Sequence, residues 1–117
     1  MDKYIIDNKS KAFALKIIKL CAQLNDDKYG YLLLKQLLRC GTSIGANVRE
    51  RLNAQSKADF ISKLQIALKE ADETAYWLEV LFKIDAMDEH IYDHLLEKNG
   101  VIRRKLIASV TTAKGET

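Results

Sequence analysis

The chain has 117 residues, enough for one domain with a hydrophobic core, and we place a single domain over residues 1–117. Apolar residues make up 48% and charged residues 30%, which is typical of a folded globular protein. No apolar stretch approaches the ~20 residues of a membrane span, and the N-terminal residues lack the apolar core of a signal peptide. We therefore expect a cytoplasmic protein with no membrane contact.

The net charge of +3 is modest, but it is unevenly distributed. Residues 1–58 contain eleven Lys and Arg against five Asp and Glu, whereas residues 59–117 contain eight against eleven. Such asymmetry can indicate an anionic partner for the first half of the chain. The alternative is that the two halves attract each other within the fold or between subunits.

A first helix is predicted over residues 8–24, where apolar residues recur at helical spacing. This stripe consists of Phe13, Ile17, Leu20 and Leu24. Asn8 or Ser10 could cap the start of the helix. Residues 25–30 are rich in Asn, Asp and Gly and predict a turn. The absence of proline and the small number of glycines favour long helices throughout.

A second helix is predicted over residues 31–52, with Leu34, Leu37, Gly41, Ile44 and Val48 along one seam. Glycine inside a helix costs about 1 kcal/mol relative to alanine, so the pair Gly41 and Gly45 needs a structural reason. Close approach of another helix backbone would supply one. The alternative is a break in the helix near Gly41.

A third helix begins after Ser56, which with Asp59 resembles a capping box. Its main apolar stripe is followed, on the opposite side, by a second group consisting of Ile66, Trp77 and Val80. One bundle core cannot cover both sides, so we interpret this group as an oligomer interface. The alternative is that long Lys or Arg side chains, or a chain terminus, cover it.

Residues 83–88 form a short connection, and a fourth helix is predicted over residues 88–112. Asn99-Gly100 interrupts its pattern and predicts a kink or a weak point in the helix. Four helices joined by short loops predict an all-α fold, an antiparallel up-down-up-down four-helix bundle.

The sequence contains no recognisable catalytic or metal motif. His90 and His94 both lack the Glu three residues earlier that di-metal bundles use, and they could form only half of a zinc site. No Ser-His-Asp or Cys-His arrangement and no phosphate-binding loop is present. Cys21 and Cys40 lie in apolar patterns and are expected to be free thiols. We expect no enzyme activity, cofactor, metal or small-molecule substrate.

Basic residues are concentrated on the first two predicted helices. Such a surface attracts phosphates with strong salt dependence, and an oligomer would repeat it around the symmetry axis. The candidates for nucleic-acid contact are Lys16, Lys19, Lys35, Arg39, Arg49 and Arg51.

Three segments resemble a known family. They are LLRCGTSIGANVRE at 37–50, ADFISKLQIALKEA at 58–71 and DETAYWLE at 72–79. They resemble the bacterial 23S rRNA intervening-sequence proteins, which are related to the accessory variability determinant of diversity-generating retroelements. The resemblance covers nearly the whole chain. The YWLE segment at 76–79 places the chain closer to the intervening-sequence branch.

The resemblance implies an antiparallel four-helix bundle that assembles as a homopentamer, with no catalytic residues. The biochemical role of the intervening-sequence branch is not established, whereas the retroelement branch binds a reverse transcriptase and nucleic acid through basic surfaces. It also gives a structural role to small and acidic residues. The candidates for helix packing and a polar network are Gly41, Ser43, Gly45, Asn47, Glu50, Glu70 and Glu73, with Thr74 as a further member.

We therefore expect a non-enzymatic, homo-oligomeric binding protein that contacts RNA, DNA or a nucleic-acid enzyme. The alternative is a protein-interaction or scaffold module without nucleic-acid contact. In that alternative, Trp77 and its neighbours control activity and the basic side chains do not.

Overall fold

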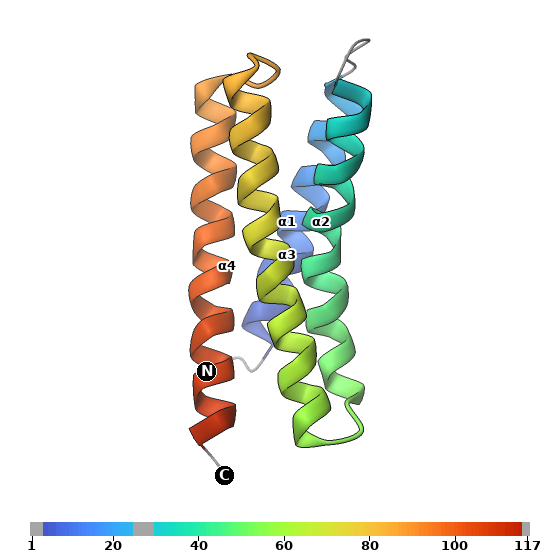
Figure 1. The fold of residues 1–117 in the computed structure, drawn as a ribbon, viewed down its shortest axis with the longest axis vertical. Coiled ribbons are helices and arrows are strands. Elements are labelled where there is room, and N and C mark those ends of the chain that lie inside the picture. Colours follow the sequence, from blue (N-terminus) through green and yellow to red (C-terminus); the bar gives the residue numbers. More distant parts are fainter. Residues whose placement is uncertain (1–3, 25–29, 116–117) are drawn as a thin grey trace.

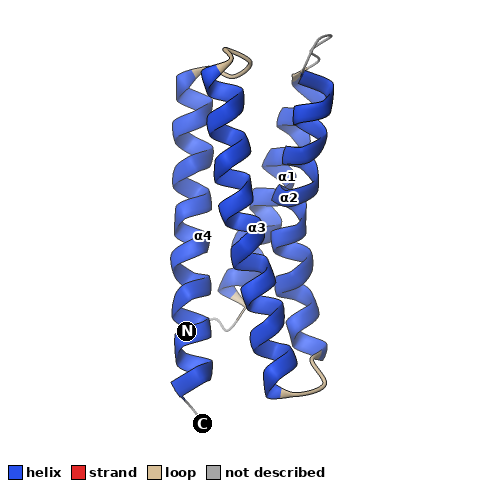
Figure 2. Cartoon of the chain, in the orientation of Figure 1, coloured by secondary structure: helices blue, strands red, loops and turns tan. Residues whose placement is uncertain are grey.

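The computed structural model describes residues 4–24 and 30–115, which form four α-helices and one short 3₁₀ helix. The α-helices are α1 (Ile5–Gln23), α2 (Gly30–Glu50), α3 (Lys57–Lys83) and α4 (Glu89–Gly115), and η1 (Arg51–Asn53) follows α2. Successive helices run in opposite directions along a bundle 49 Å long (Figure 1). The cartoon coloured by secondary structure contains no strand in these residues (Figure 2). The predicted all-α antiparallel bundle is confirmed.

The four helices pack in chain order around a square. α2 packs against α1 and α3, and α3 packs against α4, along most of their lengths. The contact between α1 and α4, which closes the square, is much the loosest of the four. Among the described helices, none is both long and apolar enough to cross a membrane.

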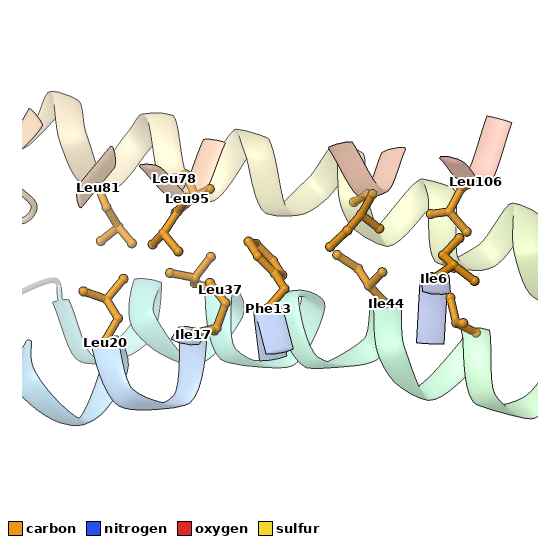
Figure 3. Close-up of a cluster of buried hydrophobic side chains, with 14 of the residues drawn as sticks. Ile6, Phe13, Ile17, Leu20, Leu37, Ile44, Leu78, Leu81, Leu95 and Leu106 are labelled. Carbon is orange, nitrogen blue, oxygen red and sulfur yellow. The ribbon is translucent and has the colours of Figure 1, made fainter. Parts of the chain in front are cut away.

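The apolar stripes predicted from the sequence meet along the axis of the bundle. Figure 3 shows this core, in which Phe13 and Ile17 of α1 face side chains from the other helices. Phe13, Ile17, Leu37, Ile44, Leu64, Leu78 and Leu106 are all at most 1% exposed. Burying each such side chain contributes about 1.5–3 kcal/mol, which favours packing of the helices against one another.

Two helix starts differ in how well the sequence indicates them. At α3 the Ser56 Oγ accepts a hydrogen bond from the Asp59 backbone N–H at 3.0 Å, as predicted, and Asp59 in turn accepts from the Gln55 N–H at 3.1 Å. The start predicted for α1 is wrong by three residues, because the helix begins at Ile5. Ser10 does not cap it: this residue is buried, and its hydroxyl donates to the Asp7 carbonyl.

The two glycines of α2 mark the close approach that was predicted, and the alternative break near Gly41 is wrong because α2 is continuous. A Cβ atom at Gly41 would lie 3.0 Å from Ile17 Cγ1, and one at Gly45 would lie 3.4 Å from the Ser10 carbonyl oxygen. Both neighbours belong to α1. The missing side chains therefore let α1 and α2 pack closely.

At Asn99-Gly100, where the sequence predicts a kink or weak point, α4 is not broken and continues from Glu89 to Gly115. Asn99 is 2% exposed and its Nδ2 donates to the Ala71 carbonyl oxygen of α3 at 3.0 Å. Asn99 thus connects α4 to α3 and does not end the helix. The turn predicted at residues 25–30 lies outside the described residues, except that Gly30 already begins α2.

Candidate binding surfaces

The six basic residues predicted to contact nucleic acid do not form one surface. Arg51, the sixth candidate, is a correction to the prediction. It is 8% exposed, and its Nη1 and Nη2 each donate to a different carboxylate oxygen of Asp7 at 3.0 Å. Nη1 also donates to the Val48 carbonyl oxygen at 2.7 Å. A buried guanidinium held by two partners in this way fastens η1 to α1 and is not available to an external phosphate.

Arg39 is exposed, but acidic residues of α3 surround it. Its Nη1 contacts Glu70 Oε2 at 3.3 Å and its Nη2 contacts Glu73. The same Glu73 oxygen accepts a hydrogen bond from the Trp77 indole N–H at 3.1 Å. This cluster of Arg39, Glu70, Glu73 and Trp77 joins α2 to α3, and its two carboxylates offset the positive charge that a phosphate would require.

The other four candidates, Lys16, Lys19, Lys35 and Arg49, are exposed and form no ion pair with any described residue. They lie on two sides of α1. Lys16 and Lys19 face α4, whereas Lys35 and Arg49 lie on the side of α2 that faces α1. The four exposed candidates therefore form two separate pairs, Lys16 with Lys19 and Lys35 with Arg49.

A groove follows the loose contact between α1 and α4, and we refer to it as the α1–α4 groove. It contains one cavity of about 320 Å³ and a second of about 160 Å³, and Lys16 lines both. The first is lined by Lys16, Lys19, Leu20, Gln23, His90, Ile91, His94 and Leu95. The second is lined by Lys9, Ala12, Phe13, Lys16, Lys98, Val101 and Ile102. None of these residues is a carboxylate.

Sequence reasoning missed this groove, although it considered some of its residues. His90 and His94 were considered only as half of a metal site, and Lys98 was not considered. His90 and His94 are four residues apart on α4 and therefore lie on one face of that helix, and lysines of α1 lie opposite them. Among the described residues, no group of three or more His, Cys, Asp or Glu is arranged to hold a metal ion.

An apolar surface that the sequence analysis did not identify lies on the outer side of α1 and α2. Leu15 is 52% exposed, Ile18 47% and Leu38 37%. A cavity of about 370 Å³ at the same side is lined by Cys21, Ala22, Leu24, Tyr31, Leu34, Lys35 and Leu38. On the outer side of α3, by comparison, Ile66 is 39% exposed while Trp77 and Val80 are half-buried.

The predicted polar network connects different partners from those expected. Asn47 Nδ2 donates to the Ser43 carbonyl oxygen within α2, and Glu50 pairs with Lys63 of α3 at 3.3 Å. Neither residue contacts Glu70, Glu73 or Thr74 through a hydrogen bond. Arg39 instead connects the two glutamates to α2, because its side chain reaches from α2 to carboxylates of α3.

Both thiols are free, and burial raises the pKa of each. Burial, with a smaller contribution from the neighbouring Cys40, raises the pKa of Cys21 to about 11, and burial also raises the pKa of Cys40. The Cys21 Sγ donates to the Leu34 carbonyl oxygen and the Cys40 Sγ to that of Leu37. A nucleophilic cysteine requires a lowered pKa, so neither thiol has the properties of a catalytic one.

Comparison with known proteins agrees with this architecture. The family model described as 23S rRNA-intervening sequence protein matches residues 2–108. A solved structure with a TM-score of 0.86 is described as a protein with unknown function from the S23 ribosomal protein family of Bacteroides thetaiotaomicron. It is 43% identical, and the alignment covers 91% of this chain and 98% of that one. No curated protein matches the chain. The chain belongs to the 23S rRNA-intervening sequence protein family.

Proposed function

We propose that this protein is a non-enzymatic, homo-oligomeric binding protein of the cytoplasm that contacts nucleic acid through basic side chains of α1 and α2. The observation that carries the proposal is the set of four exposed cationic residues without ion pairs, Lys16, Lys19, Lys35 and Arg49. A free cation releases no internal partner when it meets a phosphate.

Assembly would increase the effect of this small charge. Four phosphate contacts from one chain give weak binding, but a closed ring repeats them around its axis. The outer face of α3, with Ile66 and Val80, is one apolar surface that assembly would bury. A ring also needs a second, different surface on each copy, and Leu15 and Ile18 of α1 supply exposed apolar side chains for it. The family resemblance favours five subunits.

Nucleic-acid contact is tested by fluorescence anisotropy with a labelled RNA stem and a labelled DNA duplex at two salt concentrations. Because the four cations form two pairs on two sides of α1, a duplex that contacts Lys35 and Arg49 makes two phosphate contacts, and its affinity should fall by roughly 12-fold when salt rises fourfold. Replacing two contacts, in the variant Lys35→Glu/Arg49→Glu, should reduce the slope of log affinity against log salt by about 2. The charge-matched control is Lys57→Glu/Lys83→Glu on α3. Affinity that does not change with salt, or equal loss in the control, would overturn this part of the proposal.

Assembly is tested by mass measurement in solution. Ile66→Glu on α3 and Ile18→Glu on α1 should each reduce the oligomer to small species, whereas Ile107→Glu, at an exposed apolar position on α4, should not. Each of the first two variants retains one intact surface, so a mixture of them should form a heterodimer and nothing larger. A monomeric wild-type protein, or an oligomer that both variants leave intact, would contradict the proposed assembly.

A further inference from the structure

The α1–α4 groove has a chemistry that phosphate contact does not explain. Its floor is apolar, with Leu20, Ile91 and Leu95 in the first cavity and Phe13 and Ile102 in the second. Basic side chains line it along both helices: Lys9, Lys16 and Lys19 on α1, and His90, His94 and Lys98 on α4. Four of the apolar lining residues are core side chains at most 6% exposed, namely Phe13, Leu20, Leu95 and Ile102, while Ile91 and Val101 are half-buried and Ala12 is exposed. A phosphate backbone gains nothing from apolar surface, and Phe13 offers no face for a base to stack upon.

From this arrangement we infer that the α1–α4 groove is the docking site for an acidic amphipathic helix of a partner protein. Apolar side chains of such a helix would insert between α1 and α4, and carboxylates on its flanks would meet the lysines and histidines that line the groove. The inference goes beyond the proposed contact with nucleic acid and does not rest on it.

The shape of the groove fits a helix. Its lining extends along α1 from Lys9 to Gln23 and along α4 from His90 to Ile102. At 1.5 Å per residue these stretches are about 21 Å and 18 Å long, the length of a docked helix of about 14 residues. In Figure 1, α1 runs obliquely across the back of the bundle and diverges from α4 toward its Gln23 end, so the groove widens in that direction. A helix in this position would complete the most loosely packed side of the bundle, which is the helix-in-groove mode of recognition.

Charge complementarity selects an acidic partner. None of the residues lining the two cavities carries a negative charge, and among the described residues Lys9, Lys16, Lys19 and Lys98 have no carboxylate partner. Four like charges along one groove repel each other. A partner that brings carboxylates removes this repulsion, whereas a basic or neutral helix does not.

The direct test uses a synthetic peptide of about 14 residues, which matches the groove length. Its leucines are spaced at i, i+4, i+7 and i+11, with glutamate and alanine elsewhere, and binding to the full chain is measured by fluorescence anisotropy. Two further peptides are compared: one with every leucine replaced by serine, and one with every glutamate replaced by lysine. Both should bind at least tenfold more weakly, since the first lacks the apolar face and the second has the wrong charge.

Protein variants locate the site. Ala12 is exposed and lines the second cavity, so Ala12→Glu places a carboxylate in the groove without disturbing the core. This variant should bind the acidic peptide about tenfold or more weakly than the wild type does, because the new carboxylate repels the peptide's glutamates. The matched control is Ala58→Glu, an exposed alanine in the first turn of α3, which should change the affinity less than twofold. Circular dichroism checks that both variants remain folded.

Nucleic acid is the competing occupant, and the same experiments separate it. If the serine peptide binds as well as the leucine peptide, and a single-stranded oligonucleotide displaces both, the groove is a general polyanion surface and the inference is overturned. Equal effects of Ala12→Glu and Ala58→Glu would overturn it as well. Lys35→Glu/Arg49→Glu lies outside the groove and should leave peptide binding unchanged even where it reduces nucleic-acid binding, so failure of one proposal is distinguishable from failure of the other.

Discussion

Replacing Gly41 by alanine tests the close packing of α1 against α2. The added Cβ would lie 3.0 Å from Ile17 Cγ1 and 3.1 Å from Ile17 Cγ2. Ile17 is 0% exposed and lies in the close-packed core, so moving it displaces other core side chains. Gly41→Ala should therefore force the two helices apart or distort the Ile17 side chain.

Two opposing effects determine the magnitude. Alanine is favoured over glycine inside a helix by about 1 kcal/mol. Overpacking of a buried site costs about 1–3 kcal/mol, so the net change should lie between neutral and about 2 kcal/mol of destabilisation. Gly100 of α4 is the matched control, because the nearest atom to its added Cβ is Arg104 Nη1 at 3.5 Å, at the end of a flexible side chain. Gly100→Ala should stabilise the protein by about 1 kcal/mol.

The assay is urea unfolding of both variants, followed by circular dichroism, with the midpoint and slope compared to those of the wild type. The difference between the two variants isolates the cost of overpacking, about 1–3 kcal/mol. In thermal unfolding, each kcal/mol should shift Tm by about 4 °C for a chain of this length. If the protein is oligomeric, all samples are compared at one protein concentration, because subunit binding contributes to the measured stability.

A double-mutant cycle identifies the residue responsible. Ile17→Ala alone should cost about 2–5 kcal/mol, because it leaves a cavity in the core. Combined with Gly41→Ala it should cost less than the sum of the two single changes, by about 0.5–3 kcal/mol, since the new Cβ partly fills that cavity. The reasoning is refuted if Gly41→Ala stabilises the protein as much as Gly100→Ala does, or if the two changes at Gly41 and Ile17 are additive.

Three further predictions concern stability. Arg51→Ala should destabilise the protein by about 3–5 kcal/mol in urea, because it leaves the Asp7 carboxylate buried without its partner; a loss below about 1 kcal/mol would show that the pair behaves as a surface one. Ser56→Ala should cost about 1 kcal/mol by removing the cap of α3, and Ser56→Asp, which retains an acceptor, should recover most of it. The pKa of Cys21 is raised from 9.0 to about 11, so its thiol contributes stability that is fully present below pH 9 and is lost as the pH rises toward 11. The difference in unfolding free energy between wild type and Cys21→Ala should shrink over that interval, and a constant difference would contradict the raised pKa.

The helices could be predicted because their signals are local. Apolar residues recurring at three and four positions define one face of a helix wherever they occur, and the stripes containing Phe13, Leu37 and Leu64 are the ones that meet in the core. The cap at Ser56 was predicted for the same reason, since its partner is only three residues away. The start of α1 was missed because it has no side-chain cap, and Ser10 resembles one only in sequence.

Local sequence patterns do not show which basic residues are paired with carboxylates. Arg39 and Arg51 resemble Lys35 and Arg49 in sequence, since all four lie in or next to the second helix. Their carboxylate partners are distant: Glu70 is 31 residues from Arg39, and Asp7 is 44 residues from Arg51. Which cations are already paired therefore follows from how the helices are placed, and not from the composition of any one of them.

The sequence by itself determined the four helices, their antiparallel order and the membership of the family, because apolar periodicity, short connections and motif segments are all properties of the chain read in order. Only the tertiary structure decided which surfaces are available for binding. In the folded chain Arg51 is paired with Asp7, and Arg39 is paired with Glu70 and Glu73. Lysines of α1 lie opposite histidines of α4 across a loosely packed groove. Charge pairing and concavity depend on distances between residues far apart in the chain, and those distances exist only once the helices have packed.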